Sequence, residues 1–342
     1  MEQEAQLIER VRRAIPSRES GGLRLGIGDD AAVIAARDGS EWVLSCDAFL
    51  EGVHFFADRH PADSVGFKAL ARAASDLAAM GAQPRIFLLT LALPGSRTGK
   101  WLDEFLAGMG RAARKLGMTI AGGDLTSNLK VSISITVVGE VARGLAIKRV
   151  GARPGDILCV SGRLGGAKLG LELIKSGALT TANLKQKMYR KPLQAHLYPQ
   201  IRVGLGAWLA TRRIASAMID ISDGLSTDLA RLCSASRVGA RVWADRIPCV
   251  EPPSGKTGRA VSKLLAKLKS DPLRMALEGG DDYELLFTVP RRKVVRLRHA
   301  PGFSEIASVG EIERGREITL VGNGGRPRRL HPGGWDPFER KR

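Results

Sequence analysis

The sequence predicts a mixed α/β or α+β fold in two domains, and three observations support that prediction. The chain has 342 residues, and a domain usually holds roughly 100–200 residues. Strand-like and helical runs are interleaved, without the strict alternation of a βα barrel. A polar, turn-rich stretch at 149–156 separates the two halves of the pattern. We therefore expect domains at 1–148 and 149–342.

The first half contains the clearest helix of the chain, at 63–80. An Asp or Ser at its start is a candidate N-cap, and Gly81 ends it. The run at 131–141 alternates and is rich in Val, Ile and Thr, which indicates a strand. The further elements expected in this half are an amphipathic helix at 2–14, short strands at 32–35, 42–46 and 86–93, and a helix at 101–116.

The second half repeats the mixture of helices and strands. We expect the tail from Arg326 to be irregular, with Trp335 and Phe338 as its sizeable apolar anchors. The expected strands are 157–161, 217–221 and 285–289, and the expected helices are 166–175, 227–234 and 262–269.

Composition and charge exclude several classes of protein. With 44% hydrophobic residues, the chain is expected to fold, and its four widely spaced cysteines favour neither disulfides nor a zinc site. No apolar run reaches the roughly 20 residues that a membrane span needs, and the polar first residues do not resemble a signal peptide, so a cytoplasmic protein is expected. The net charge of +18 is compatible with nucleic acid, acidic membranes, phosphorylated substrates or a simply Arg-rich composition. The 5% aromatic content disfavours a groove that stacks single-stranded nucleic acid.

The aspartates of this basic chain are concentrated beside glycines and at strand ends. Glycine-rich segments often bring backbone N–H groups against phosphate oxygens, yet each carboxylate near a phosphate would cost on the order of 4 kcal/mol at about 4 Å and an effective dielectric near 20. Bound Mg²⁺ resolves this conflict, because it is typically held by one or two carboxylates together with substrate phosphates. The segments are GIGDD (26–30), SCD (45–47), GGDLT (122–126), DISDG (220–224) and EGGDDYELLF (278–287).

Each aspartate segment also has a simpler interpretation when it is considered alone. Asp30 could belong to a turn or a cap, Asp76 could pair with Arg72 along one helix face, and Ser222 or Asp223 could cap the following helix. His54 could be an ordinary loop histidine. The joint occurrence of these segments favours a metal and phosphate site. Walker A, GxSxG and protein-kinase signatures are missing from the sequence, which disfavours those chemistries.

The ordered segments resemble one family, the thiamine-monophosphate kinases, within the ATP-dependent superfamily of aminoimidazole ribonucleotide synthetase. The resemblance extends over most of the chain, and the order and spacing of so many segments make it specific. Its segments are GIGDDAAV, SCDAFLEGVHF (45–55), KALARAASDLAAMGAQP (68–84), GGDLT, KRVGARPGD (148–156), VSGRLGGA (160–167), IDISDGL (219–225), EGGDDYELLFTV and GGWDPF (333–338).

The resemblance implies roles for individual residues. Two positions depart from the family pattern: Cys46 replaces the usual Thr, and Asp281 stands where Glu is common. A thiol is a poor Mg²⁺ ligand, although the backbone carbonyl of Cys46 could still coordinate. The implied metal positions are Asp30, Ser45, Cys46, Asp47, Asp76, Asp124, Asp220 and Asp223, the ATP contacts are Gly123, Asp124, Arg149 and Ser222, and the substrate contacts are His54, Asp281 and Trp335.

The resemblance further implies an aminoimidazole ribonucleotide synthetase-like fold. An N-terminal domain would bind ATP and Mg²⁺ and form a homodimer through its sheet, and a C-terminal α+β domain would cover the nucleotide. ATP and thiamine monophosphate would give ADP and thiamine diphosphate by direct in-line transfer, with Asp47, Asp124 and Arg149 as the catalytic residues. Trp335 would either stack on the substrate or anchor the tail.

Two alternatives remain open from the sequence. The first is an enzyme of the same superfamily with another acceptor. The second is a nucleic-acid-binding protein that uses the basic segments 291–298 and 326–342, although a solvated charged surface explains those segments more simply. We expect no specific nucleic acid partner and no membrane association.

Overall fold

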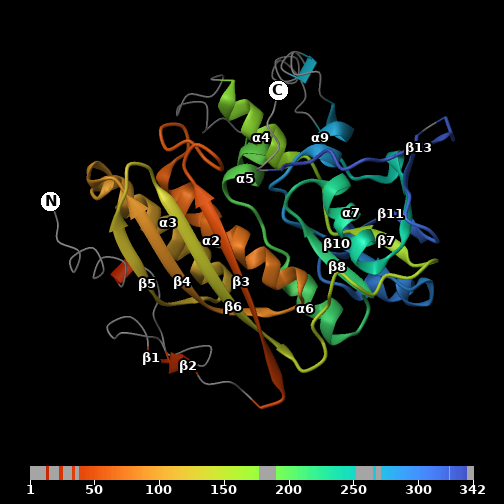
Figure 1. Cartoon of the computed structure of the whole chain (residues 1–342), viewed down its shortest axis with the longest axis horizontal. Coiled ribbons are helices and arrows are strands. Elements are labelled where there is room, and N and C mark those ends of the chain that lie inside the picture. Colours follow the sequence, from red (N-terminus) through yellow and green to blue (C-terminus); the bar gives the residue numbers. More distant parts are fainter. Residues whose placement is uncertain are drawn as a thin grey trace. The chain divides into compact units, whose positions relative to one another are not determined.

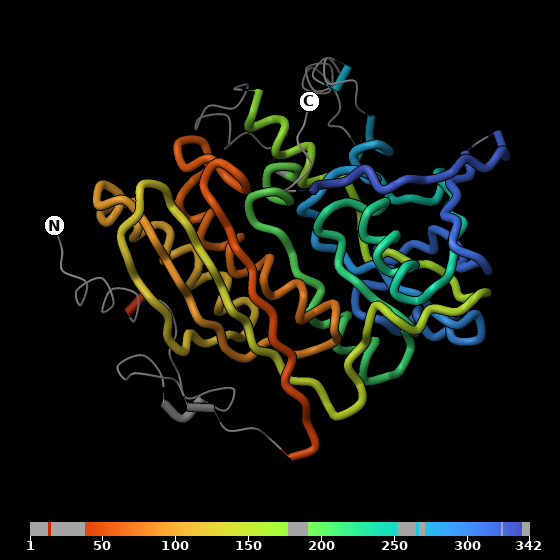
Figure 2. Tube along the Cα trace, viewed as in Figure 1, coloured from red at the N-terminus to blue at the C-terminus, as the bar shows by residue number. Residues whose placement is uncertain are grey.

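The computed structural model describes residues 13–14, 23–25, 33–34, 38–176, 190–251, 265–266, 271–322 and 324–336. It divides the chain into two compact units, Met1–Ala146 and Ile147–Arg342, which are coloured from red to yellow and from yellow-green to blue in Figure 2. In the described ranges, none of the helices combines the length and apolarity that a membrane crossing requires.

A four-stranded sheet with two helices on one face forms the described part of the N-terminal unit (Figure 1). The strand order is β3-β6-β4-β5, with β4 and β5 parallel and β6 antiparallel to both β3 and β4. The crossovers from β3 to β4 and from β4 to β5 advance in the same direction, and right-handed connections then place both helices on one face. The elements are β3 (Ser40–Leu50), α2 (Ala62–Ala79), β4 (Gln83–Leu93), η1 (Gly95–Arg97), α3 (Lys100–Leu116), β5 (Thr119–Ser127) and β6 (Ser132–Ala142), besides the separate pair β1 (Leu23–Leu25) and β2 (Val33–Ile34).

Alternation along β6 distinguishes the two faces of this sheet. Ile133, Ile135 and Val137 are buried on the face that α2 covers, whereas Ser134 and Thr136 are partly exposed on the other. The helices predicted at 63–80 and 101–116 and the strand predicted at 131–141 are confirmed. The predicted Asp or Ser cap of α2 is wrong, because Pro61 is its N-cap and makes no side-chain cap bond.

The C-terminal unit contains a seven-stranded sheet in the order β13-β12-β9-β11-β7-β10-β8. Its neighbouring strands are antiparallel except for β12 and β9. Leu225, Leu229 and Leu232 of α7 pack against Ile219 and Leu286 of the sheet in a continuous apolar core. The strands are β7 (Ile157–Val160), β8 (Ala217–Ile221), β9 (Gly239–Trp243), β10 (Glu284–Val289), β11 (Ala307–Glu313), β12 (Ile318–Val321) and β13 (Pro327–Arg329), and the helices are α4 (Gly166–Lys175), α5 (Arg190–Leu197), α6 (Val203–Thr211), α7 (Leu225–Ser236), η3 (Ala244–Arg246), α9 (Pro272–Glu278), η4 (Arg291–His299) and η5 (Phe303–Glu305).

The predicted second-half elements agree with the structure where it describes them. The strands at 157–161, 217–221 and 285–289 and the helices at 166–175 and 227–234 are confirmed. The helices predicted at 2–14 and 262–269 fall largely outside the described residues. The tail is not wholly irregular, because β13 pairs with β12 and so extends the sheet.

Candidate functional site

Four polar side chains meet where strand β3 faces helix α2. Ser45 and Asp47 are two residues apart on β3, so both point to the helix-covered face. Arg72 and Asp76 are four residues apart and share one side of α2. The Ser45 hydroxyl donates to Oδ2 of Asp76, and Nε of Arg72 donates to Oδ2 of Asp47 at 3.3 Å. We call Ser45, Asp47, Arg72 and Asp76 the β3–α2 cluster.

Arg72 therefore joins the helix to the strand. Its guanidinium also lies over the ring of Phe49, at 5.3 Å from the ring centroid, and the Phe49 ring is tilted against His54 at a centroid separation of 5.6 Å. Nδ1 of His54 accepts the Leu50 N–H at 3.0 Å. A neutral His54 in this geometry carries its proton on Nε2. His54 is thus held next to the β3–α2 cluster by local contacts.

Cys46 points away from this cluster. It lies between Ser45 and Asp47 on β3, so its side chain is on the exposed face of the sheet. Its sulfur is 3.5 Å from the hydroxyl oxygens of both Ser134 and Thr136 on β6. The side chain of Cys46 is consequently separated from the two carboxylates by the sheet itself.

Gly123 and Asp124 lie inside strand β5. A Cβ at Gly123 would overlap the carbonyl oxygen of Leu89 on β4, so glycine is required where these parallel strands run close together. Asp124 is exposed and pairs in register with Thr90 of β4. The register row that contains Asp47 and Ile135 continues through Leu89 to Gly123. Asp124 therefore lies in the next row of the sheet, not in that of Asp47.

The loop after β8 carries the acidic residues of the C-terminal unit. Asp220 lies inside β8 and is buried, at 4% exposure. Ser222 and Asp223 come directly after the strand. Oδ2 of Asp228 accepts the N–H groups of Ser222 and Asp223, at 3.1 and 3.0 Å. Arg231 donates to both Asp223 and Asp228. The N-cap of α7 is Gly224, with no side-chain cap bond, so the cap interpretation of Ser222 and Asp223 is wrong.

Asp228 is fully buried, and its burial raises its pKa to about 6, although the backbone hydrogen bonds and Arg231 act in the opposite direction. Sequence analysis missed this residue. The signal was its position three residues before Arg231 on the same helix.

Asp281 lies beside the same loop. It adopts a left-handed backbone conformation with φ of 71°, and its N–H donates to the Ser222 carbonyl at 2.8 Å. Its Oδ1 accepts the Tyr283 hydroxyl at 2.7 Å, and its Oδ2 is 3.8 Å from Nδ1 of the buried His196. These contacts fix the carboxylate against the loop that carries Ser222.

The C-terminal segment also docks on this loop. The Trp335 N–H donates to the carbonyl of Asp223 at 2.9 Å, while the N–H groups of Gly333 and Gly334 donate to the hydroxyls of Ser226 and Thr227. The Trp335 side chain keeps 37% of its surface exposed. Trp335 is therefore an anchor of the tail through its backbone, and its ring stays accessible.

Asp282 holds the start of helix α4. Its two carboxylate oxygens accept the N–H groups of Gly165 at 2.6 Å and Ala167 at 3.1 Å. Desolvation of the carboxylate raises its pKa to about 7, although the two backbone hydrogen bonds act in the opposite direction. The sequence shows Asp282 beside Asp281, but it does not show that the two carboxylates serve different elements.

Asp30 and Arg149 are the two expected site residues that remain. Asp30 lies outside the described residues. Arg149 is exposed, and its carbonyl accepts the Ser236 hydroxyl at 2.9 Å. Within the part of the chain that the structure describes, no three His, Cys, Asp or Glu side chains are close enough to hold a metal ion.

Known proteins match the chain along most of its length. The family models of the AIR synthase related protein match residues 28–141 with the N-terminal domain and residues 153–323 with the C-terminal domain. The thiamine-monophosphate kinase of Escherichia coli (strain K12) is 35% identical over 318 residues, which cover 92% of both chains. The chain belongs to the thiamine-monophosphate kinase family.

Solved structures agree with this membership of the thiamine-monophosphate kinase family. The crystal structure of thiamine-monophosphate kinase from Stenotrophomonas maltophilia K279a has a TM-score of 0.77 at 36% identity, covering 93% of this chain and 96% of its own. The structure of AaThiL complexed with AMPPCP and TMP has a TM-score of 0.75 at 29% identity and covers 99% of both chains. The predicted two-domain aminoimidazole ribonucleotide synthetase-like fold is confirmed, with a four-stranded sheet in one unit and a seven-stranded sheet in the other.

Proposed function

We propose that this chain transfers the γ-phosphoryl group of ATP to thiamine monophosphate and releases ADP and thiamine diphosphate in the cytoplasm. The observation that carries the proposal is the match over 99% of both chains to a structure whose bound molecules are AMPPCP and TMP. The curated relatives named thiamine-monophosphate kinase support the same reaction.

This reaction needs little proton transfer, but it requires the protein to compensate a large negative charge. A phosphate monoester has a second pKa near 6, so the acceptor is already anionic at neutral pH and needs no strong base. Donor and acceptor repel each other, and the transferred group carries its charge on three equatorial oxygens in the transition state. The protein must therefore hold two polyanions in line and compensate their charge.

The donors of the β3–α2 cluster fit a magnesium ion. Asp47 and Asp76 present hard carboxylate oxygens on one face, Ser45 adds a hydroxyl, and Asp47 keeps 28% of its side chain exposed. A magnesium ion held there would supply positive charge to offset the negative charge of the phosphates. Within the N-terminal unit, Ser45, Asp47 and Asp76 would hold it. Asp30, the Cys46 carbonyl, Asp124, Asp220 and Asp223 remain expectations from the family resemblance alone.

The remaining roles follow from positioning. Gly123 lets the backbone before Asp124 run close to its neighbouring strand, and Arg149 supplies an exposed positive charge for the nucleotide. Asp228 fixes the N–H groups of Ser222 and Asp223. The loop that carries these two residues would therefore contact the nucleotide without changing its conformation.

We propose His54 of the N-terminal unit, and Asp281 and Trp335 of the C-terminal unit, as residues that contact thiamine phosphate, and each is held by contacts within its own unit. His54 is set by the turn after β3, Asp281 by Tyr283, and the exposed ring of Trp335 by the docked tail. Stacking of an aromatic ring on a cationic thiazolium contributes roughly 0.5–2 kcal/mol.

We further propose that two copies pair through the exposed face of the N-terminal sheet. Leu44 and Leu88 on that face are 65% and 38% exposed, and Leu88 shares a register row with Thr136 and Cys46. Exposed apolar side chains gathered on one sheet face indicate a protein contact.

An assay of ADP release tests the reaction. With Mg·ATP we expect ADP production that depends on thiamine monophosphate, and thiamine diphosphate as the second product. Other phosphate and non-phosphate acceptors serve as controls. ADP release that is indifferent to thiamine monophosphate, or that requires a different acceptor, would contradict the proposal.

A further inference from the structure

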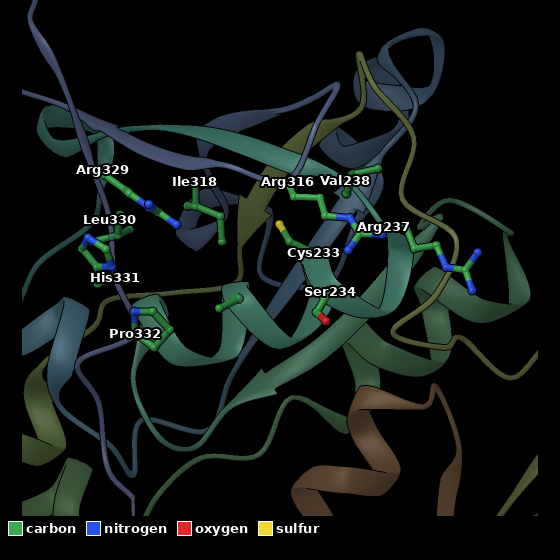
Figure 3. A pocket seen from close by; sticks show the side chains of 11 residues that line it. Cys233, Ser234, Arg237, Val238, Arg316, Ile318, Arg329, Leu330, His331 and Pro332 are labelled. Carbon is green, nitrogen blue, oxygen red and sulfur yellow. The ribbon is translucent and has the colours of Figure 1, made fainter.

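A second concave site lies in the C-terminal unit, next to the C-terminal half of α7. It is a cavity of about 360 Å³ between that helix, strand β12 and the segment 329–332. Figure 3 shows Cys233 and Ser234 on α7 and Arg237 just after its end, with Arg316, Ile318 and Arg329 on the segments across the cavity. The candidate kinase site uses the other end of the helix, where Asp228 holds the loop before it.

The cavity combines an apolar floor with a cationic rim. Cys233, Val238 and Ile318 are buried, at 2%, 7% and 8% exposure, whereas Arg316 and Arg329 are exposed at its edge. No lining residue is acidic. Of the acidic residues close to Arg316 in the chain, Glu317 is exposed and does not line the cavity, and Glu313 pairs with Arg241 at 2.8 Å. In the ranges that the structure describes, neither Arg316 nor Arg329 pairs with a carboxylate.

We propose that this cavity binds a small phosphate ester. Arginine guanidinium groups match phosphate geometry through paired N–H donors, and the apolar floor accommodates the body of the ester. A cavity of this volume lies within the range typical of small-molecule sites. The same features disfavour nucleic acid, whose backbone is recognised on open basic surfaces rather than in a pocket with an apolar floor.

Phenyl phosphate is a suitable probe, because it joins a dianionic phosphate to an apolar ring. Binding is measured by calorimetry in EDTA with about 150 mM salt, without nucleotide, so that the aspartates of the kinase site repel the probe instead of binding it through a metal. We expect one saturable site that binds phenyl phosphate at least 10-fold more tightly than inorganic phosphate.

The double variant R316A/R329A is expected to weaken phenyl phosphate binding at least 10-fold. Its matched control is R314A/R328A, which removes the same charge from adjacent exposed positions that do not line the cavity. Arg328 and Arg329 are neighbours on β13 and point to opposite sides of the sheet. Thermal melting confirms that both variants fold, and the kinase activity of both should match the wild type.

Three results would overturn the proposal. They are no binding to the wild-type protein, equal affinity for phenyl phosphate and inorganic phosphate, and an equal loss in both double variants. The last result would mean that diffuse positive charge attracts any polyanion, nucleic acid included. A loss confined to R316A/R329A supports the assigned cavity.

Discussion

Neighbouring side chains on β3 point to opposite faces of the sheet, so the role of each residue depends on its direction as well as on its type. Ser45 and Asp47 contact α2, while Cys46 between them contacts Ser134 and Thr136 on the other face. The replacement of the usual Thr by Cys46 therefore leaves the two carboxylates of the β3–α2 cluster unchanged.

Substitution of Asp47 by Asn should strongly reduce turnover and leave the fold intact. The change removes one charge from the proposed magnesium and phosphate site, and lost charge stabilisation of this kind costs on the order of 10²–10³-fold in kcat. The lost contact with Arg72 is partly exposed, so stability should change by about 1 kcal/mol or less. Steady-state ADP release and thermal melting measure the two effects.

Cys46→Thr provides the matched control for that experiment. Its side chain lies on the opposite face of the sheet from Asp47, so kcat should stay within about twofold of the wild type. A loss in Cys46→Thr as large as that in Asp47→Asn would show that the thiol takes part in the site.

The raised pKa of Asp282 predicts that the stability of the protein depends on pH. Its folded pKa of about 7 lies above the ordinary value of 3.8 because the group is buried, so the folded state binds the proton more tightly than the unfolded state does. Its contribution is full below about pH 4 and is lost as the pH rises toward and through 7. Between pH 5 and 8, this group should lower the free energy of unfolding by about 2–3 kcal/mol.

Urea titrations at pH 5 and pH 8 measure this effect, with Asp282→Asn as the comparison. The variant cannot titrate at this position, so its stability should fall less between the two pH values than that of the wild type. The same fall in both proteins would assign the pH dependence to other groups.

At the scale of elements, helices α2 and α3 pack through two reciprocal glycines. A Cβ at Gly66 of α2 would overlap the Phe105 carbonyl of α3, and a Cβ at Gly108 of α3 would overlap the Asp63 carbonyl of α2. The two backbones therefore touch directly. Because α2 carries Arg72 and Asp76, this contact also sets the position of half of the β3–α2 cluster.

Gly66→Ala and Gly108→Ala should each destabilise the protein by about 1–3 kcal/mol, because either methyl group forces the helices apart. Gly204→Ala is the control, since Gly204 lies in α6 with open space around it. There the substitution should stabilise by up to about 1 kcal/mol through helix propensity. Urea denaturation gives all three values, and destabilisation by Gly204→Ala equal to the others would contradict the packing argument.

At the scale of the whole molecule, the exposed face of the N-terminal sheet is the surface through which we propose that two copies pair. Leu44 is 65% exposed in the middle of a strand, and burial against a second copy would remove this apolar surface from water.

Leu44→Lys should therefore shift the protein from dimer to monomer, measured by light scattering during size-exclusion chromatography. Leu129→Lys is the control, because Leu129 is 94% exposed between β5 and β6 and lies outside the sheet. A wild-type protein that is monomeric, or a dimer that Leu44→Lys leaves unchanged, would contradict the proposed pairing.

The sequence by itself determined the family, the two-domain class and the main helices and strands, because hydrophobic periodicity and the order of short segments are local properties. It also identified the aspartates as a group, since their residue types and glycine neighbours can be read directly from the chain.

Only the tertiary structure decided the partners of these side chains. Arg72 is four residues from Asp76, yet it donates across to Asp47, and Asp228 supports a loop that precedes its own helix. Likewise, the segment GGDLT lies within a strand, where Gly123 meets Leu89 of its neighbour. Such contacts depend on strand register and helix packing, which join residues distant in the chain, and no local pattern encodes them.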